Sequence, residues 1–164
     1  MAELDPVDRI TIGAVGEPGE RVFYLQARRG DQLVTLIVEK QQVQLLAATL
    51  VDVLSRLGTE VEEVDDEMDL EEPVLPEWRA GRLAVGYEED RDLVLLEVEE
   101  LVSEEGGDEG DQIRFWATRA QMLSLARHGA AVAAAGRPEC RYCGNPLDPE
   151  GHVCPAMNGH GSEA

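Results

Sequence analysis

Two stretches of this 164-residue chain carry the same order of predicted elements, and this repetition constrains the fold more than any other feature. In the first stretch, alternation of apolar with other residues predicts three strands, at residues 9–15, 22–27 and 33–38. A helix is predicted over residues 40–57, because apolar side chains recur there at spacings of three and four. Gly58 follows, where glycine commonly ends a helix.

The second stretch repeats three strands and one helix. Strands are predicted at residues 81–87, 93–101 and 113–117, and a helix is predicted over residues 119–135. Because the order of elements is the same in both stretches, each can be compared with the other position by position.

The residues of the two stretches also echo each other. RLAVG at 82–86 follows RITIG at 9–13 by 73 residues, and RAQM at 119–122 follows KQQV at 40–43 by 79 residues. The larger second offset fits a longer acidic loop around residues 106–110. The sequence therefore predicts an internal duplication.

Neither half alone would bury a three-stranded sheet and a single helix well. We therefore expect an α+β fold, in which duplicated βββα halves pair about a pseudo-twofold axis and form a mainly antiparallel sheet with packed helices. A small C-terminal zinc knuckle is expected in addition. The predicted divisions are a first βββα half, an acidic linker, a second βββα half and a C-terminal zinc-binding segment, at residues 1–58, 59–77, 78–136 and 137–164.

Charge narrows the classes of partner. The chain has 34 acidic and 14 basic residues, a formal net charge of −20, and nine acids fall within residues 60–72. Such a run repels itself and extends. Nucleic acids and anionic membranes require a basic surface, so we expect neither as a partner. A basic protein remains compatible. No signal peptide or apolar run of membrane-spanning length is recognised, so a cytoplasmic location is expected.

The clearest site motif is a cluster of the only three cysteines. Cys140 and Cys143 form a CxxCG pattern, and Cys154 lies in the sequence GHVCP. Two thiolates two residues apart can hold one zinc ion, and the glycine after them allows a tight turn. An odd number of clustered cysteines favours a metal site in a reducing compartment over a set of disulfides. We expect one structural zinc ion per chain.

A closed tetrahedral site needs a fourth ligand, and two histidines compete for it. His152 lies two residues before Cys154, so in an extended segment both side chains point to the same side. His160 follows Cys154 by six residues, which suits a returning loop. We favour His152, and we keep both His160 and an open fourth position as alternatives.

Four arginines lie on or beside predicted strands of this acidic protein: Arg21, Arg28, Arg114 and Arg119. If the halves pair, Arg28 and Arg114 could line one face and bind an anionic small molecule bidentately. We favour ordinary pairing with the abundant surface carboxylates. His128, within the second predicted helix, is expected to have a surface or packing role.

The stretches LDPVDRITIGAVGEPGERVFYLQARRG and CRYCGNPLDPEGHVCPAMNG resemble an uncharacterised actinobacterial protein family, a domain of unknown function. The resemblance covers nearly the whole chain. It implies a cytoplasmic bacterial protein whose cysteines form a zinc site, and it supplies no activity, substrate or catalytic residue. In that family's pattern the position of His160 is held by other residues such as Tyr, which favours His152 as the ligand.

No catalytic constellation is recognisable in the sequence. We therefore expect an uncharacterised zinc-binding protein with a non-enzymatic binding or adaptor role and an unknown, basic protein partner. The alternative is a small-molecule metabolic enzyme, with its site between the two halves or at an open zinc. A pocket with converging polar groups would favour the alternative, and a sealed zinc without a cleft would favour the binding role.

Overall fold

The computed structural model describes residues 2–17, 19–58, 68–102 and 110–135. This part of the chain has an α+β fold with a mixed seven-stranded sheet and two helices, which confirms the predicted class. The elements, in chain order, are β1 (Ala2–Leu4), β2 (Arg9–Val15), β3 (Val22–Arg29), β4 (Gln32–Val38), α1 (Lys40–Arg56), β5 (Trp78–Glu88), β6 (Leu93–Glu100), β7 (Gln112–Ala117) and α2 (Arg119–Ala135).

The sheet contains both kinds of pairing. Its strand order is β1-β7-β6-β5-β4-β3-β2. Within each half the three strands form an antiparallel meander, whereas β4 pairs with β5 and β1 pairs with β7 in parallel. The sheet is therefore mixed, and its parallel pairings join the two halves.

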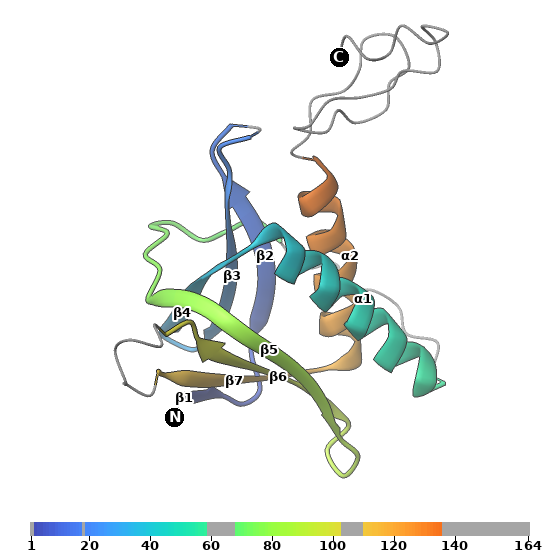
Figure 1. Ribbon diagram of the computed structural model, residues 1–164. Helices are drawn as coiled ribbons and strands as arrows, with labels where there is room; N and C mark the ends of the chain where they lie inside the picture. Colours follow the sequence, from blue (N-terminus) through green and yellow to red (C-terminus); the bar gives the residue numbers. More distant parts are fainter. Residues whose placement is uncertain (1, 18, 59–67, 103–109, 136–164) are drawn as a thin grey trace, which may run out of the picture.

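The segment from β1 to β2 borders both ends of this strand order. The Val7 amide donates to the Trp116 carbonyl at 2.8 Å, and the next amide, Asp8, donates to the Arg28 carbonyl at 2.7 Å. Two adjacent residues thus bridge β7 on one side and the end of β3 on the other. The strands of the described ranges consequently form an incomplete ring, which stays open along the outer edge of β2, and α1 and α2 pack against each other beside it (Figure 1).

Matching glutamines anchor the two helices. The Glu39 amide donates to the Gln42 side chain at 2.7 Å, and the Thr118 amide donates to the Gln121 side chain at 2.9 Å. These are N-terminal caps, which stabilise the first turn of a helix. Each glutamine then donates to two carbonyls where a strand of the other half enters the ring: Gln42 to Ala80 and Gly81, and Gln121 to Val7 and Asp8.

The end of the predicted acidic linker is folded onto the sheet, rather than extended into solvent. Thr11 donates to the Met68 carbonyl at 2.6 Å, and the amide of Gln26 bonds both the backbone N–H and the carbonyl of Glu71, at 2.7 and 3.1 Å. Thr11 and Gln26 are almost fully buried beneath this segment. Residues 68–72 therefore cover the face of β2 and β3 opposite α2, because their backbone satisfies polar side chains of the sheet.

Neither helix of the described ranges is long and apolar enough to cross a membrane.

Candidate functional site

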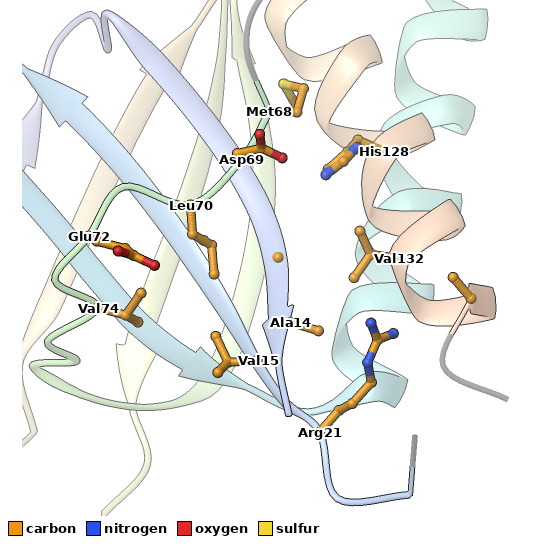
Figure 2. A pocket seen from close by; sticks show the side chains of 12 residues that line it. Ala14, Val15, Arg21, Met68, Asp69, Leu70, Glu72, Val74, His128 and Val132 are labelled. Carbon is orange, nitrogen blue, oxygen red and sulfur yellow. The ribbon is translucent and has the colours of Figure 1, made fainter. Parts of the chain in front are cut away.

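A pocket of about 340 Å³ lies where three distant stretches of the chain meet. Its walls come from the end of β2, from the covering segment and from α2, so it lies between the two halves (Figure 2). Among the described strands β2 pairs only with β3, so its other edge faces this pocket. The lining residues are Gly13, Ala14, Val15, Arg21, Met68, Asp69, Leu70, Glu72, Val74, His128, Val132 and Ala135.

The turn between β2 and β3 places Arg21 in the pocket. Gly16 has a φ of 112°, and a Cβ there would lie 2.9 Å from the Glu20 carbonyl oxygen, so the turn requires glycine. The register then sets Val15 opposite Val22, with Arg21 just before β3. The chain is thereby reversed tightly enough to hold the Arg21 side chain against the end of β2.

Arg21 is distinguished by its unsatisfied nitrogens. Its Nε and Nη1 atoms are buried and have no hydrogen-bond partner in the described part of the protein. Figure 2 shows the guanidinium directed toward Ala14 and Val132, inside the pocket. A guanidinium stays charged at all ordinary pH values, and a buried polar group without a partner costs about 1–3 kcal/mol. Within the described residues, these two N–H donors therefore lack the hydrogen-bond acceptor that a buried donor normally has.

His128 supplies a second polar group from α2. It is followed at helical spacing by Val132 and Ala135, and all three line the pocket. The imidazole is directed from the helix toward the cavity in Figure 2. A neutral imidazole offers one donor and one acceptor, and a protonated one offers two donors. His128 can therefore hydrogen-bond a ligand at the end of the pocket beside Met68 and Asp69, with Val132 between it and Arg21 (Figure 2).

The other wall carries two exposed carboxylates, Asp69 and Glu72. The backbone between them is fixed by Glu71, which accepts from Arg28 and Arg9 at 3.0 Å each. The hydrogen bond from Arg28, and then that from Arg9, holds the pKa of Glu71 below its usual value despite some desolvation. This ion-paired cluster therefore fixes the acidic wall.

The remaining arginines of interest have internal partners. Arg28 pairs with Glu71, Arg114 with Glu97 at 3.0 Å, and Arg119 with Asp92 at 2.6 Å. The expected pairing with carboxylates is confirmed for these three arginines and not for Arg21. Arg28 lies on β3 and Arg114 on β7, and each already has a carboxylate beside it.

The predicted zinc ligands lie outside the described residues. They are Cys140, Cys143, His152, Cys154 and His160. Within the described ranges, no three His, Cys, Asp or Glu side chains gather to hold a metal ion. The zinc site stays a prediction from sequence.

Comparison with known proteins gives a family and no activity. The family model described as "Protein of unknown function (DUF3090)" matches residues 2–154. The chain belongs to this family. No curated protein and no solved structure matches the chain. What can be inferred about function therefore rests on the pocket and on the C-terminal motif.

Sequence reasoning found part of this pocket. Arg21 is one of four arginines on or beside predicted strands, but nothing in the sequence separates it from the three that are paired. Leu70 and Val132 gave no signal as pocket residues, because only the fold of residues 68–74 brings them together. The signal in the sequence is the glycine of RITIG. Because Gly13 has no side chain, Leu70 can lie directly on β2.

Proposed function

We propose that the protein is a binding protein that holds a small molecule by an anionic group in the pocket between β2, residues 68–74 and α2. The observation that carries this proposal is the Arg21 guanidinium, whose Nε and Nη1 atoms are buried and have no partner among the described residues. A guanidinium presents parallel N–H groups that match the two oxygens of a carboxylate or a phosphate. A ligand anion would supply the missing acceptor.

The rest of the pocket supports a small organic ligand. Val15, Leu70 and Val132 give apolar surface, and His128 offers a further donor. Ligand sites commonly combine a mostly apolar lining with a few polar groups that fix orientation. The anionic group would bind Arg21, the apolar part would contact the valine and leucine side chains, and His128 would hydrogen-bond a more distant polar group of the ligand.

The test is calorimetric binding of short-chain carboxylates and inorganic phosphate to the full chain. Arg21→Met keeps an apolar stem and removes the donors, and we expect it to weaken binding at least about tenfold. Arg82→Met is the matched control, because Arg82 is an exposed residue of β5 that does not line this pocket. Equal binding by wild type and Arg21→Met would refute the proposal.

The alternative function, a small-molecule enzyme, also predicts a site between the two halves. We favour binding because the described lining offers one histidine, two exposed carboxylates and no Ser, Cys or Lys side chain as a nucleophile. Prolonged incubation of a bound ligand with the protein, followed by mass spectrometry, distinguishes the two. Conversion of the ligand that is lost in His128→Gln would establish the enzyme alternative.

The C-terminal segment is proposed to hold one structural zinc ion through Cys140, Cys143 and Cys154, with His152 as the favoured fourth ligand and His160 as the alternative. The family match supports His152, because it extends to residue 154 and stops before His160. Elemental analysis of chelator-free protein should give one zinc per chain. Loss in His152→Ala and retention in His160→Ala is the expected result, and retention in both would indicate an open site.

We also propose that the two halves arose by duplication. The support is that Gln42 and Gln121 make equivalent contacts, and that the carbonyls they bind are separated by 73 residues, like the RITIG and RLAVG motifs. Two halves of unrelated origin would not be expected to share both the glutamine contacts and the sequence separation between the carbonyls that accept them. A common origin would explain why a glutamine caps the first turn of both helices.

We also propose a cytoplasmic protein with a basic protein partner and without nucleic-acid or membrane partners, and the net charge of −20 supports this choice of partner. Such a partner would bind through long-range attraction, which salt screens. Affinity capture at low salt, with release by raised salt, would test it. A partner retained equally at high salt would contradict the electrostatic basis.

A further inference from the structure

The pocket has charges of both signs, which bears on the kind of molecule it takes. The Arg21 guanidinium lies on one side, and the Asp69 and Glu72 carboxylates lie on the other, with Leu70 and Val132 between them in the view of Figure 2. None of the described ion pairs includes either carboxylate. Arg9 instead bonds the Asp69 backbone carbonyl, at 2.6 Å.

We infer that the ligand is a zwitterion, namely a free amino acid with an aliphatic side chain. This inference rests on the proposed function and specifies it. The carboxylate of the ligand would bind Arg21, its ammonium group would face Asp69 and Glu72, and its side chain would lie against the apolar lining. The three chemical parts of such a molecule match the three kinds of surface in the pocket.

A ligand with only negative charge fits less well. It would bind Arg21 in a pocket that also holds two carboxylates, in a protein with a net charge of −20. Like charges at short range oppose binding, and opposite charges favour it. An ammonium group turns the acidic wall from a repulsive into an attractive surface, while the carboxylate still satisfies the guanidinium.

The size and the lining narrow the class further. A volume of about 340 Å³ is near the lower end of ligand pockets, which suits a single amino acid better than a nucleotide or a long peptide. The apolar side chains that line it include no aromatic ring: Ala14, Val15, Met68, Leu70, Val74, Val132 and Ala135. These residues favour an aliphatic side chain over a charged one.

The experiment compares three probes with the same branched carbon chain by calorimetry. L-leucine carries both charges, 4-methylpentanoate lacks the ammonium group, and 3-methylbutylamine lacks the carboxylate. For the wild-type full chain we expect leucine to bind at least about tenfold more tightly than 4-methylpentanoate, and the amine to bind most weakly.

Two variants test which residues of the pocket recognise the ammonium group and the carboxylate of the ligand. In the double variant Asp69→Asn with Glu72→Gln, the advantage of leucine over 4-methylpentanoate should fall below about threefold, while 4-methylpentanoate binds at least as tightly as before. Arg21→Met should weaken both leucine and 4-methylpentanoate. The matched control is Glu89→Gln with Asp90→Asn, which removes the same charge from the exposed turn after β5. Thermal unfolding checks that each variant folds.

The outcomes separate this inference from the proposed function. If 4-methylpentanoate binds the wild type as tightly as leucine and Arg21→Met loses it, the anion site stands and the zwitterion is refuted. If the double acid variant keeps the full advantage of leucine, the acidic wall does not recognise the ammonium group and the inference also fails. If none of the three probes binds, both proposals are overturned for ligands of this class.

Discussion

The two halves of the sheet have equivalent rows of side chains with opposite chemistry. In the first half, Thr11, Gln26 and Thr35 lie side by side across β2, β3 and β4, and all three are buried. In the second half, the register places Ala84, Glu97 and Arg114 side by side across β5, β6 and β7, where Ala84 is exposed and the other two are partly exposed. The outer members of the rows are 73 and 79 residues apart, as the repeated motifs are.

The difference follows from what covers each row. Residues 68–71 lie on the first row, so its side chains must be neutral and must hydrogen-bond: Gln26 bonds Thr35 and the backbone of Glu71. The second row faces solvent, where Arg114 and Glu97 can form an ion pair at little desolvation cost. One strand pattern therefore supports two surfaces, and the segment that covers the first of them forms a wall of the pocket.

The largest change in stability is expected when the central residue of one row is replaced by the central residue of the other. Gln26→Glu would put a carboxylate against the Glu71 carbonyl, and we expect a loss of about 3 kcal/mol in unfolding free energy at neutral pH. The penalty should shrink as pH falls, because burial raises the pKa of the new carboxyl and protonation restores a donor. Urea denaturation between acidic and neutral pH measures both effects.

The reverse exchange is the control for that experiment. Glu97→Gln removes one partner of an exposed pair, and we expect a change of less than about 1 kcal/mol. Equal losses in Gln26→Glu and Glu97→Gln would show that burial beneath residues 68–71 does not distinguish the rows.

The equivalent glycines give a second, smaller test. A Cβ on Gly13 would lie 2.5 Å from Leu70 Cγ, whereas a Cβ on Gly86 would lie 3.7 Å from the nearest atoms of Leu95. Gly13→Ala should therefore destabilise by about 2 kcal/mol or displace the covering segment, and Gly86→Ala should change stability by less than about 0.5 kcal/mol. Thermal unfolding, with proteolysis near Leu70, would report both responses, and similar behaviour of the two variants would contradict the covering role of Leu70.

The smallest expected effect concerns the ion pairs that hold the cover. Glu71→Gln should destabilise by about 1 kcal/mol or less at neutral pH, since Glu71 is partly exposed. The folded-state pKa of Glu71 is lowered, so its contribution is complete above the ordinary value of 4.5 and is lost as pH falls through the lower, folded-state pKa. The stability difference between wild type and variant should thus be constant near neutrality and shrink in acid. A difference that grows in acid would be inconsistent with these pairs.

Local patterns predicted the elements well. Strand 9–15 and helix 119–135 match β2 and α2, because each depends on the spacing of apolar residues within one segment. The three-residue strand β1 was missed, since so short a segment has no measurable period. The parallel pairings and the incomplete ring were also missed, because they depend on contacts between distant segments.

The pocket shows the same limit of sequence reasoning. The sequence identified Arg21 as one of several interesting arginines, but the presence or absence of a partner is decided by where acids such as Glu71 come to lie. Residues 68–74 looked like the end of a charged linker, and their charges concealed the apolar contact of Leu70 with Gly13. The acidic composition predicts a segment exposed to solvent. Instead, backbone hydrogen bonds to Thr11 and Gln26 hold it on the sheet.

The bridge made by Val7 and Asp8 has a consequence for the order of assembly during synthesis. Val7 leaves the ribosome long before Trp116, which accepts its amide hydrogen and lies near the end of β7, the last strand of the described ranges. The β2–β3–β4 meander and α1 can form early, but the incomplete ring can form only after β7 has emerged. Until then the edge around β1 and Val7 lacks its neighbour, so a nascent chain that stalls before β7 would expose an unpaired strand edge to other chains.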